Sequence, residues 1–120
     1  IMKELYRVRR AGAAVRIHGP HPRHDDFITD PTHVRAILPD TLAMFDLEVN
    51  ERWRAEKAAN TQLAIYTRTD FKMLSATVTP DDRFKDASGN VLVSIEELLE
   101  KARVELNVIK EYQITLEVRK

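Results

Sequence analysis

The last quarter of the chain carries the two strongest structural patterns, and these constrain the fold most. Between Ser94 and Ile109 apolar residues recur at the spacing of one helix face, and Ser94 with Glu97 forms a capping box at the start. From Tyr112 to Arg119 apolar and polar residues alternate, which is typical of a strand with one face in the core. The sequence therefore predicts a helix followed by a strand at this end of the chain.

Shorter patterns predict the remaining elements. Alternation of apolar and charged residues indicates an N-terminal hairpin, and runs rich in Thr, Tyr, Ile and Val indicate two more strands. The expected strands are 4–10, 15–18, 63–69 and 71–79. Asp30-Pro31 marks the start of a short helix that Pro39 ends, and helical spacing favours a second helix within 40–60. Residues 45–49 also alternate like a strand, so the start of that second helix stays open.

The resulting order, β-β-α-α-β-β-α-β, lacks the regular alternation of parallel βαβ units. We therefore expect the α+β class, with a mostly antiparallel sheet of about five strands and two or three helices packed on one face. Residues 1–120 are expected to form a single globular domain, with Ile1 a remnant before a natural start at Met2. Terminal strands such as 112–119 can pair across a dimer, so a homodimer is an open expectation.

The residue types that the chain lacks exclude several kinds of site. Cysteine is absent, which removes disulfides, thiolate nucleophiles and cysteine-ligated zinc. The three glycines are far apart and no serine lies in a nucleophile elbow, which argues against Walker or Rossmann loops and common hydrolases. The spacing from Asp86 to Glu97 imitates a calcium loop, but Val91 occupies the position that requires glycine. An enzyme is therefore less expected than a binding protein, and no resident cofactor is predicted.

Histidine is confined to one short segment that two prolines keep from becoming a helix. Neutral imidazoles and carboxylates are ligands for zinc, nickel, copper or iron, so this segment is an alternative site for a divalent transition metal. Its candidate ligands are His18, His21, His24, Asp25 and Asp26. On this hypothesis the protein binds metal or is a small metal-dependent enzyme, and His24 beside Asp25 also has the residue types of a proton-transfer pair.

Charge is unevenly spread although the chain is neutral overall. Residues 1–24 hold six basic side chains against one acidic, whereas 25–80 and 81–120 are mildly acidic. Such segregation steers a partner toward the basic part. The candidate partner-binding residues are Arg7, Arg9, Arg10, Arg16 and Arg23.

The leading hypothesis is a small non-enzymatic interaction domain that binds a protein partner, such as an adaptor or inhibitor of the kind carried by phages and mobile elements. A nucleic-acid-binding domain that uses the same arginines, with Tyr6 as a stacking surface, is a further alternative. No apolar run approaches the roughly 20 residues that span a bilayer, so we expect no membrane partner and a cytoplasmic protein.

Overall fold

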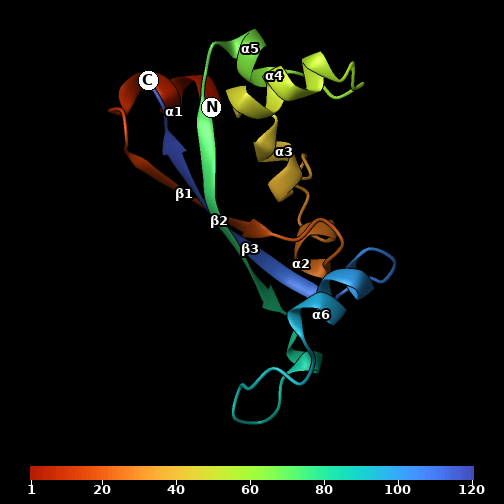
Figure 1. Ribbon diagram of the computed structural model, residues 1–120. Coiled ribbons are helices and arrows are strands. Elements are labelled where there is room, and N and C mark those ends of the chain that lie inside the picture. The colour runs from red at the N-terminus through yellow and green to blue at the C-terminus, as the bar shows by residue number, and fades with distance from the viewer. The chain divides into compact units, whose positions relative to one another are not determined.

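A computed structural model describes residues 1–120 of the chain (Figure 1). Its sheet has three antiparallel strands, β1 (Ala14–Pro20), β2 (Phe71–Pro80) and β3 (Ile109–Val118), in the order β1-β3-β2. Buried and partly exposed residues alternate in β3 from Tyr112 to Val118, as expected for a strand with one face on the core. The strands predicted from 71 to 79 and near the end of the chain are therefore confirmed.

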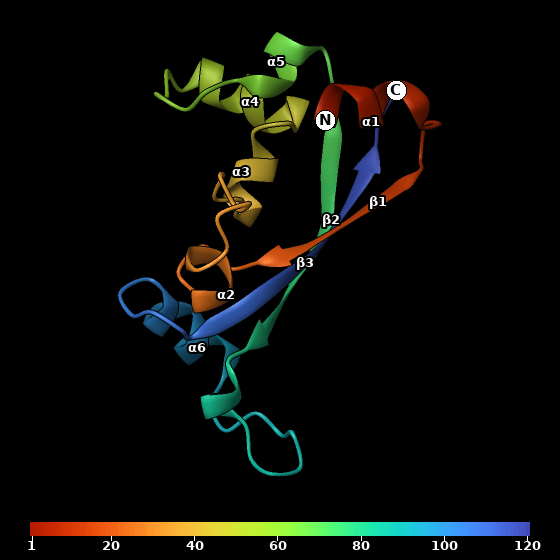
Figure 2. The same cartoon turned by 180° about the vertical axis from the view of Figure 1, so that it is seen from behind.

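Six short α-helices and one 3-10 turn lie before and between the strands. They are α1 (Met2–Val8), α2 (Asp25–Ile28), α3 (Pro39–Ala43), α4 (Leu47–Ala55), α5 (Leu63–Thr67), α6 (Ile95–Ala102) and η1 (Asp82–Phe84). Figure 2 shows α1 beside the C-terminal end of β3, where the Tyr6 hydroxyl donates a hydrogen bond to the Arg119 carbonyl at 2.6 Å. None of these helices is long and apolar enough to cross a membrane.

The α+β class is right, but the expected sheet of about five strands with two or three helices is wrong. Most of the segments 4–10 and 63–69 are helical, as α1 and α5. In α1, strong helix formers predominate and a Glu4–Arg7 ion pair joins successive turns. In α5, the Thr67 hydroxyl donates to the Leu63 carbonyl at 2.7 Å. Alternation over so few residues fits a helix face as well as a strand, so tertiary packing decided the outcome.

The structure differs from two helices predicted between 30 and 60, because aspartate side chains accept backbone N–H groups there. The helix expected after Asp30 is wrong, since its carboxylate accepts the N–H of Thr32 at 2.9 Å and stabilises a turn instead. The helix expected within 40–60 is divided into α3 and α4. Asp46 makes this break, because its side chain accepts the N–H of Val49 and caps the start of α4.

The predicted start of α6 is confirmed, but its predicted end is wrong. The Ser94 hydroxyl accepts the N–H of Glu97 at 3.2 Å, which is the capping bond that the sequence indicates. The helix ends at Ala102 instead of Ile109, and Asn107 adopts a left-handed backbone conformation with φ of 56°. This turn redirects the chain so that residue 109 begins β3.

β3 is the central strand of the sheet, with β1 on one side and β2 on the other (Figure 1). Both of its edges are therefore hydrogen-bonded within the chain. The reason given for a homodimer, a terminal strand free to pair with a second copy, does not hold for β3. The homodimer itself stays a prediction.

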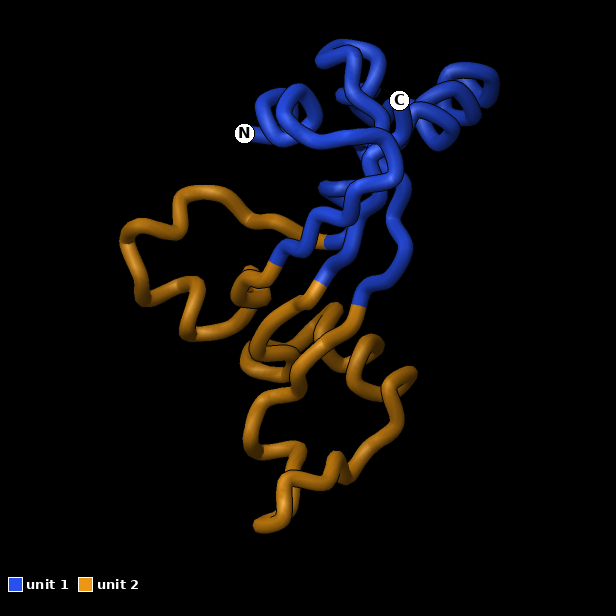
Figure 3. The backbone as a smooth tube through the Cα atoms, turned by 90° about the vertical axis from the view of Figure 1, so that its left-hand side faces the viewer, with its two compact units in different colours: residues 1–17, 39–76, 114–120 blue, residues 18–38, 77–113 orange.

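The chain divides into two compact units, each made of segments distant in sequence (Figure 3). Unit 1 comprises 1–17, 39–76 and 114–120, and unit 2 comprises 18–38 and 77–113. In unit 1 the buried apolar side chains are Val15, Leu42, Ala64, Phe71, Ile114, Leu116 and Val118. In unit 2 they centre on Leu98, Ala102, Val108 and Ile109. The single domain expected from length stays a prediction.

Candidate interaction surface

The two units carry opposite net charge although the chain as a whole is neutral. Unit 1 contains twelve basic and eight acidic side chains, a net of +4. Unit 2 contains seven basic and eleven acidic side chains, a net of −4. The net charge of unit 1 equals that of 1–17 alone, five basic against one acidic side chain, because 39–76 and 114–120 together hold seven basic and seven acidic side chains.

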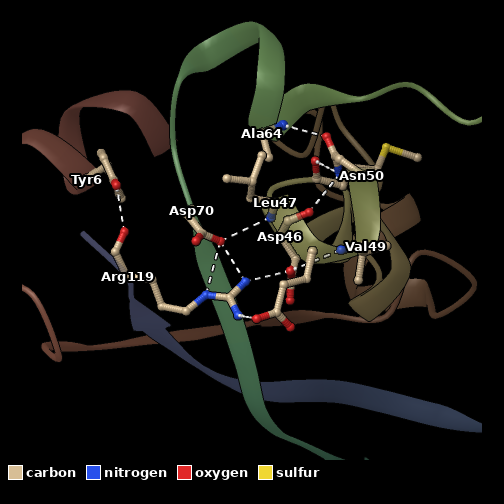
Figure 4. Close-up of polar contacts among 10 residues, drawn as sticks. Tyr6, Asp46, Leu47, Val49, Asn50, Ala64, Asp70 and Arg119 are labelled. Carbon is tan, nitrogen blue, oxygen red and sulfur yellow. Dashed lines mark hydrogen bonds and ion pairs between the residues drawn. The ribbon is translucent and has the colours of Figure 1, made fainter. Parts of the chain in front are cut away.

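A partly buried ion-pair cluster neutralises part of the acidic charge of unit 1 (Figure 4). The Arg119 guanidinium lies 2.6 Å from Asp46, 2.6 Å from Asp70 and 2.9 Å from Glu48. Burial by itself lowers the pKa of Arg119, but its bonds to Asp70 and Asp46 outweigh burial and raise the pKa above its usual value. Arg119 therefore stays charged and holds β3 against the start of α4 and the start of β2.

Asn50 extends the same cluster toward α5 (Figure 4). Its side chain is 0% exposed, and its amide nitrogen donates to the carbonyls of Met44 at 3.0 Å and Asp46 at 2.9 Å. Its amide oxygen accepts the N–H of Ala64 at 3.0 Å. All of these polar groups have partners, and Asn50 thereby joins α4 to α5 and to the turn before α4.

None of the residues Asp46, Asp70 and Arg119 is among the site residues that the sequence predicts. One signal was present: Asp46 lies three residues before Val49 at the start of a helix-forming run, the position of a capping residue. Nothing in the sequence links Asp46 with Asp70 and Arg119, since they are far apart along the chain and come together only in the fold.

Seven of the exposed cations of unit 1 form what we call the basic surface; Arg52, Arg54, Lys57 and Lys72 are also exposed but are not counted in it. Its members are Lys3, Arg7, Arg9, Arg10, Arg16, Arg68 and Lys120. The side chains of Arg9, Arg10 and Arg16 are exposed and make no ion pair or hydrogen bond within the chain. Four of the five arginines proposed from sequence thus lie on this surface. Lys3 comes from the same N-terminal stretch, whereas Arg68 and Lys120 were missed because they come from other segments.

Arg23, the fifth proposed arginine, belongs to unit 2 and has an internal partner. Its guanidinium donates to the carbonyl of Ala102 at 3.0 Å, and its backbone carbonyl accepts the N–H of Asn107 at 2.9 Å. Arg23 therefore supports the end of α6 within the acidic unit.

A hollow of about 550 Å³ opens among α1, the end of α5 and the C-terminal residue. Its charged lining consists of four cations and one carboxylate: Lys3, Arg7, Arg68, Lys120 and Glu4. Glu4 is paired with Arg7, and the Lys120 ammonium donates to the Arg9 carbonyl at 2.7 Å. The lining keeps a net charge of +3, so it favours an anionic group.

The histidine segment lies in unit 2, and two of its three proposed imidazoles are buried. His21 Nδ1 accepts the N–H of Arg23 at 2.9 Å, and its ring packs against Tyr112 with centroids 5.1 Å apart. Burial, with smaller contributions from Arg23 and His24, lowers the pKa of His21 to about 4. His24 lies with Nε2 2.8 Å from Asp81, and its Nδ1 accepts the N–H of Asp26 to cap α2. These two histidines hold the segment in place.

Among the other proposed ligands, Asp26 stays beside His24, with its carboxylate 3.5 Å from Nδ1. His18 is exposed, with Nε2 3.0 Å from Glu111, and shares the lining of a hollow of about 250 Å³ with Asp26 and Glu111. Asp25 is exposed, and its N–H donates to the Asn107 side chain at 2.8 Å. No group of three or more His, Cys, Asp or Glu side chains gathers in an arrangement that holds a metal ion. The transition-metal site stays a hypothesis without geometric support.

Comparison of the chain with protein-family models, with curated proteins and with solved structures found no match.

Proposed function

We propose that the protein is a non-enzymatic interaction module that binds an acidic surface of a partner protein through the basic surface of unit 1. The observation that carries the proposal is which charged side chains of unit 1 form ion pairs and which remain unpaired. Four of its eight carboxylates are engaged in ion pairs: Asp46, Asp70 and Glu48 with Arg119, and Glu4 with Arg7. Most of the cations have no such partner and remain exposed, so unit 1 presents a positive potential that accelerates encounter with an acidic partner.

The side chains beside the free cations favour a protein partner over a nucleic acid. The Tyr6 ring already has two neighbours, since it makes a T-shaped contact with Phe71 at 5.5 Å and Lys120 lies 4.9 Å over it. Tyr66 on α5, by contrast, is 83% exposed and lies two residues from Arg68. Exposed Tyr and Arg together are the composition of binding hot spots in protein interfaces.

Charge reversal on unit 1, matched by the same reversal on unit 2, tests the proposal. The test variant is Arg10→Glu with Arg16→Glu, and the control is Arg35→Glu with Arg103→Glu, which changes net charge equally at exposed sites of unit 2. Each immobilised protein is incubated with lysate of the source organism, with and without nuclease treatment, and the retained proteins are quantified by mass spectrometry.

We expect wild type and control to retain the same partner, and the test variant to retain at least about tenfold less of it, since a close like-charge contact weakens association strongly. Raising the salt concentration should release the partner from wild type. Equal retention by all three proteins would refute a role for the basic surface. Retention that disappears only after nuclease treatment would assign the surface to nucleic acid.

A further inference from the structure

We propose that the hollow lined by Lys3, Arg7, Arg68 and Lys120 binds a phosphate group carried by the partner protein, with Arg68 as its central ligand. This inference rests on the proposed function and names the chemistry that the basic surface recognises. It begins from the backbone of Arg68, which lies at the C-cap of α5 with φ of 54° and ψ of 49°. That left-handed conformation favours glycine, since a Cβ atom is crowded there.

The backbone at this position explains how α5 ends but does not explain an arginine. The N–H of residue 68 donates to the Ala64 carbonyl, and a glycine would make the same bond with less strain. The guanidinium of Arg68 makes no ion pair or hydrogen bond within the chain. The Arg68 guanidinium is therefore available to a ligand, and its place in the lining of the hollow, not its backbone conformation, distinguishes it from Lys57, which has the same φ of 54°.

The surroundings of Arg68 define that ligand as an anion. The Arg68 side chain lines the 550 Å³ hollow and also a neighbouring hollow of about 460 Å³ beside α4 and α5. Lys3 joins it from α1 and Lys120 from the end of the chain, and both bring ammonium donors. Arg7 is oriented by Glu4, whose carboxylate is thereby neutralised.

The number of converging cations favours a phosphate over a carboxylate. A phosphorylated side chain carries between one and two negative charges more than its hydroxyl precursor and three strong acceptor oxygens. A carboxylate carries one charge and two oxygens, which leaves part of a lining of net charge +3 unsatisfied. Arginine is the preferred partner of phosphate because its planar donors bind two oxygens at once. A phosphorylated serine, threonine or tyrosine of the partner protein therefore fits the hollow.

The chain offers a matched control for a test at Arg68. Lys57 follows α4 with the same φ of 54°, is exposed, and lines neither hollow. Arg68→Gly and Lys57→Gly therefore remove one positive charge and one strained backbone position each. Both variants are expected to fold at least as well as wild type, so a loss of binding cannot be ascribed to unfolding.

The binding experiment titrates inorganic phosphate and O-phosphoserine into isotope-labelled protein, with chloride as the reference salt at constant ionic strength, and follows amide chemical shifts. We expect saturable shifts confined to residues around the hollow in wild type and in Lys57→Gly. In Arg68→Gly the affinity should fall at least about tenfold, the usual effect of losing one charged hydrogen-bonding ligand. Absence of saturation, or equal affinity in Arg68→Gly, would overturn the phosphate site.

Phosphatase treatment of the lysate separates this inference from the proposed function. If the partner carries the phosphate, treated lysate should yield severalfold less retained protein, and Arg68→Gly should show the same loss with untreated lysate. Retention that resists phosphatase but is lost when the charges of Arg10 and Arg16 are reversed would refute the phosphate site. It would still support binding of an acidic partner through the basic surface. Retention that resists all three changes would refute both proposals.

Discussion

Acid should destabilise the protein through His21 before it protonates most carboxylates. The native ring holds Nδ1 as an acceptor for the N–H of Arg23 at 2.9 Å, so only the neutral imidazole fits. Burial, together with Arg23 and His24, lowers the pKa of His21 from the usual 6.5 to about 4. Protonation would break the bond to Arg23 and place a charge against Tyr112 on a ring that is only 3% exposed.

The sign and size of the effect follow from the two pKa values. As pH falls below 6.5 the unfolded chain takes up the proton first, so the free energy of unfolding decreases until the native ring also titrates near pH 4. The difference between these values corresponds to about 3 kcal/mol, which is fully present above pH 6.5 and lost by pH 4. Burial opposes ionisation of Asp81, but the N–H of Arg83 and the His24 side chain stabilise its carboxylate and lower its pKa. The stability that this carboxylate contributes is therefore lost at still lower pH than that of His21.

The assay is urea unfolding followed by circular dichroism at a series of pH values between neutral and 4. His21→Asn keeps a side-chain acceptor for the N–H of residue 23 and removes the titrating group. We expect this variant to lose little stability over the range in which wild type loses about 3 kcal/mol. His18→Asn, at an exposed ring, serves as the control and should follow wild type. The reasoning is refuted if His21→Asn and wild type show the same dependence on pH.

Two further substitutions test the supports of each unit by urea unfolding at neutral pH. Arg119→Met should lower the free energy of unfolding by about 3 kcal/mol, because it leaves Asp46 and Asp70 as partly buried carboxylates without a cation. Adding Asp70→Asn should recover part of that loss, and a single-variant effect below about 1 kcal/mol would contradict a supporting role for the cluster. Leu98→Ala should cost about 2–5 kcal/mol, since Leu98 is 2% exposed at the centre of unit 2. Leu99→Ala is the control because Leu99 is 45% exposed, and equal costs at the two sites would show that α6 buries a different face.

Local sequence patterns predicted those elements that interactions or side-chain directions within the same short segment define. Ser94 identified the start of α6 because a capping hydroxyl bonds to an N–H three residues ahead. The alternation after Tyr112 identified β3 because a strand turns successive side chains to opposite faces. The same reasoning failed for 4–10 and 63–69, where short runs are compatible with either element and packing in unit 1 selects a helix.

The candidate site was predictable to the extent that its residues are neighbours in sequence. Arg7, Arg9, Arg10 and Arg16 stand out as one basic stretch, and their exposure agrees with that interpretation. Arg68 does not stand out, because its unpaired guanidinium and its left-handed backbone are properties of the folded chain. The histidine segment attracted attention as a ligand set, but in the fold His21 and His24 serve mainly to hold their own loop and α2.

By itself the sequence determined the α+β class, the capped helix, the two long strands and the basic character of the N-terminal stretch. The tertiary structure alone decided which charges are cancelled and which remain free. Asp46, Asp70 and Arg119 are separated by up to 73 residues, yet ion pairs of 2.6 Å join them. Electrostatic attraction depends on distance in space and on exclusion of water, and neither quantity is a property of position along the chain.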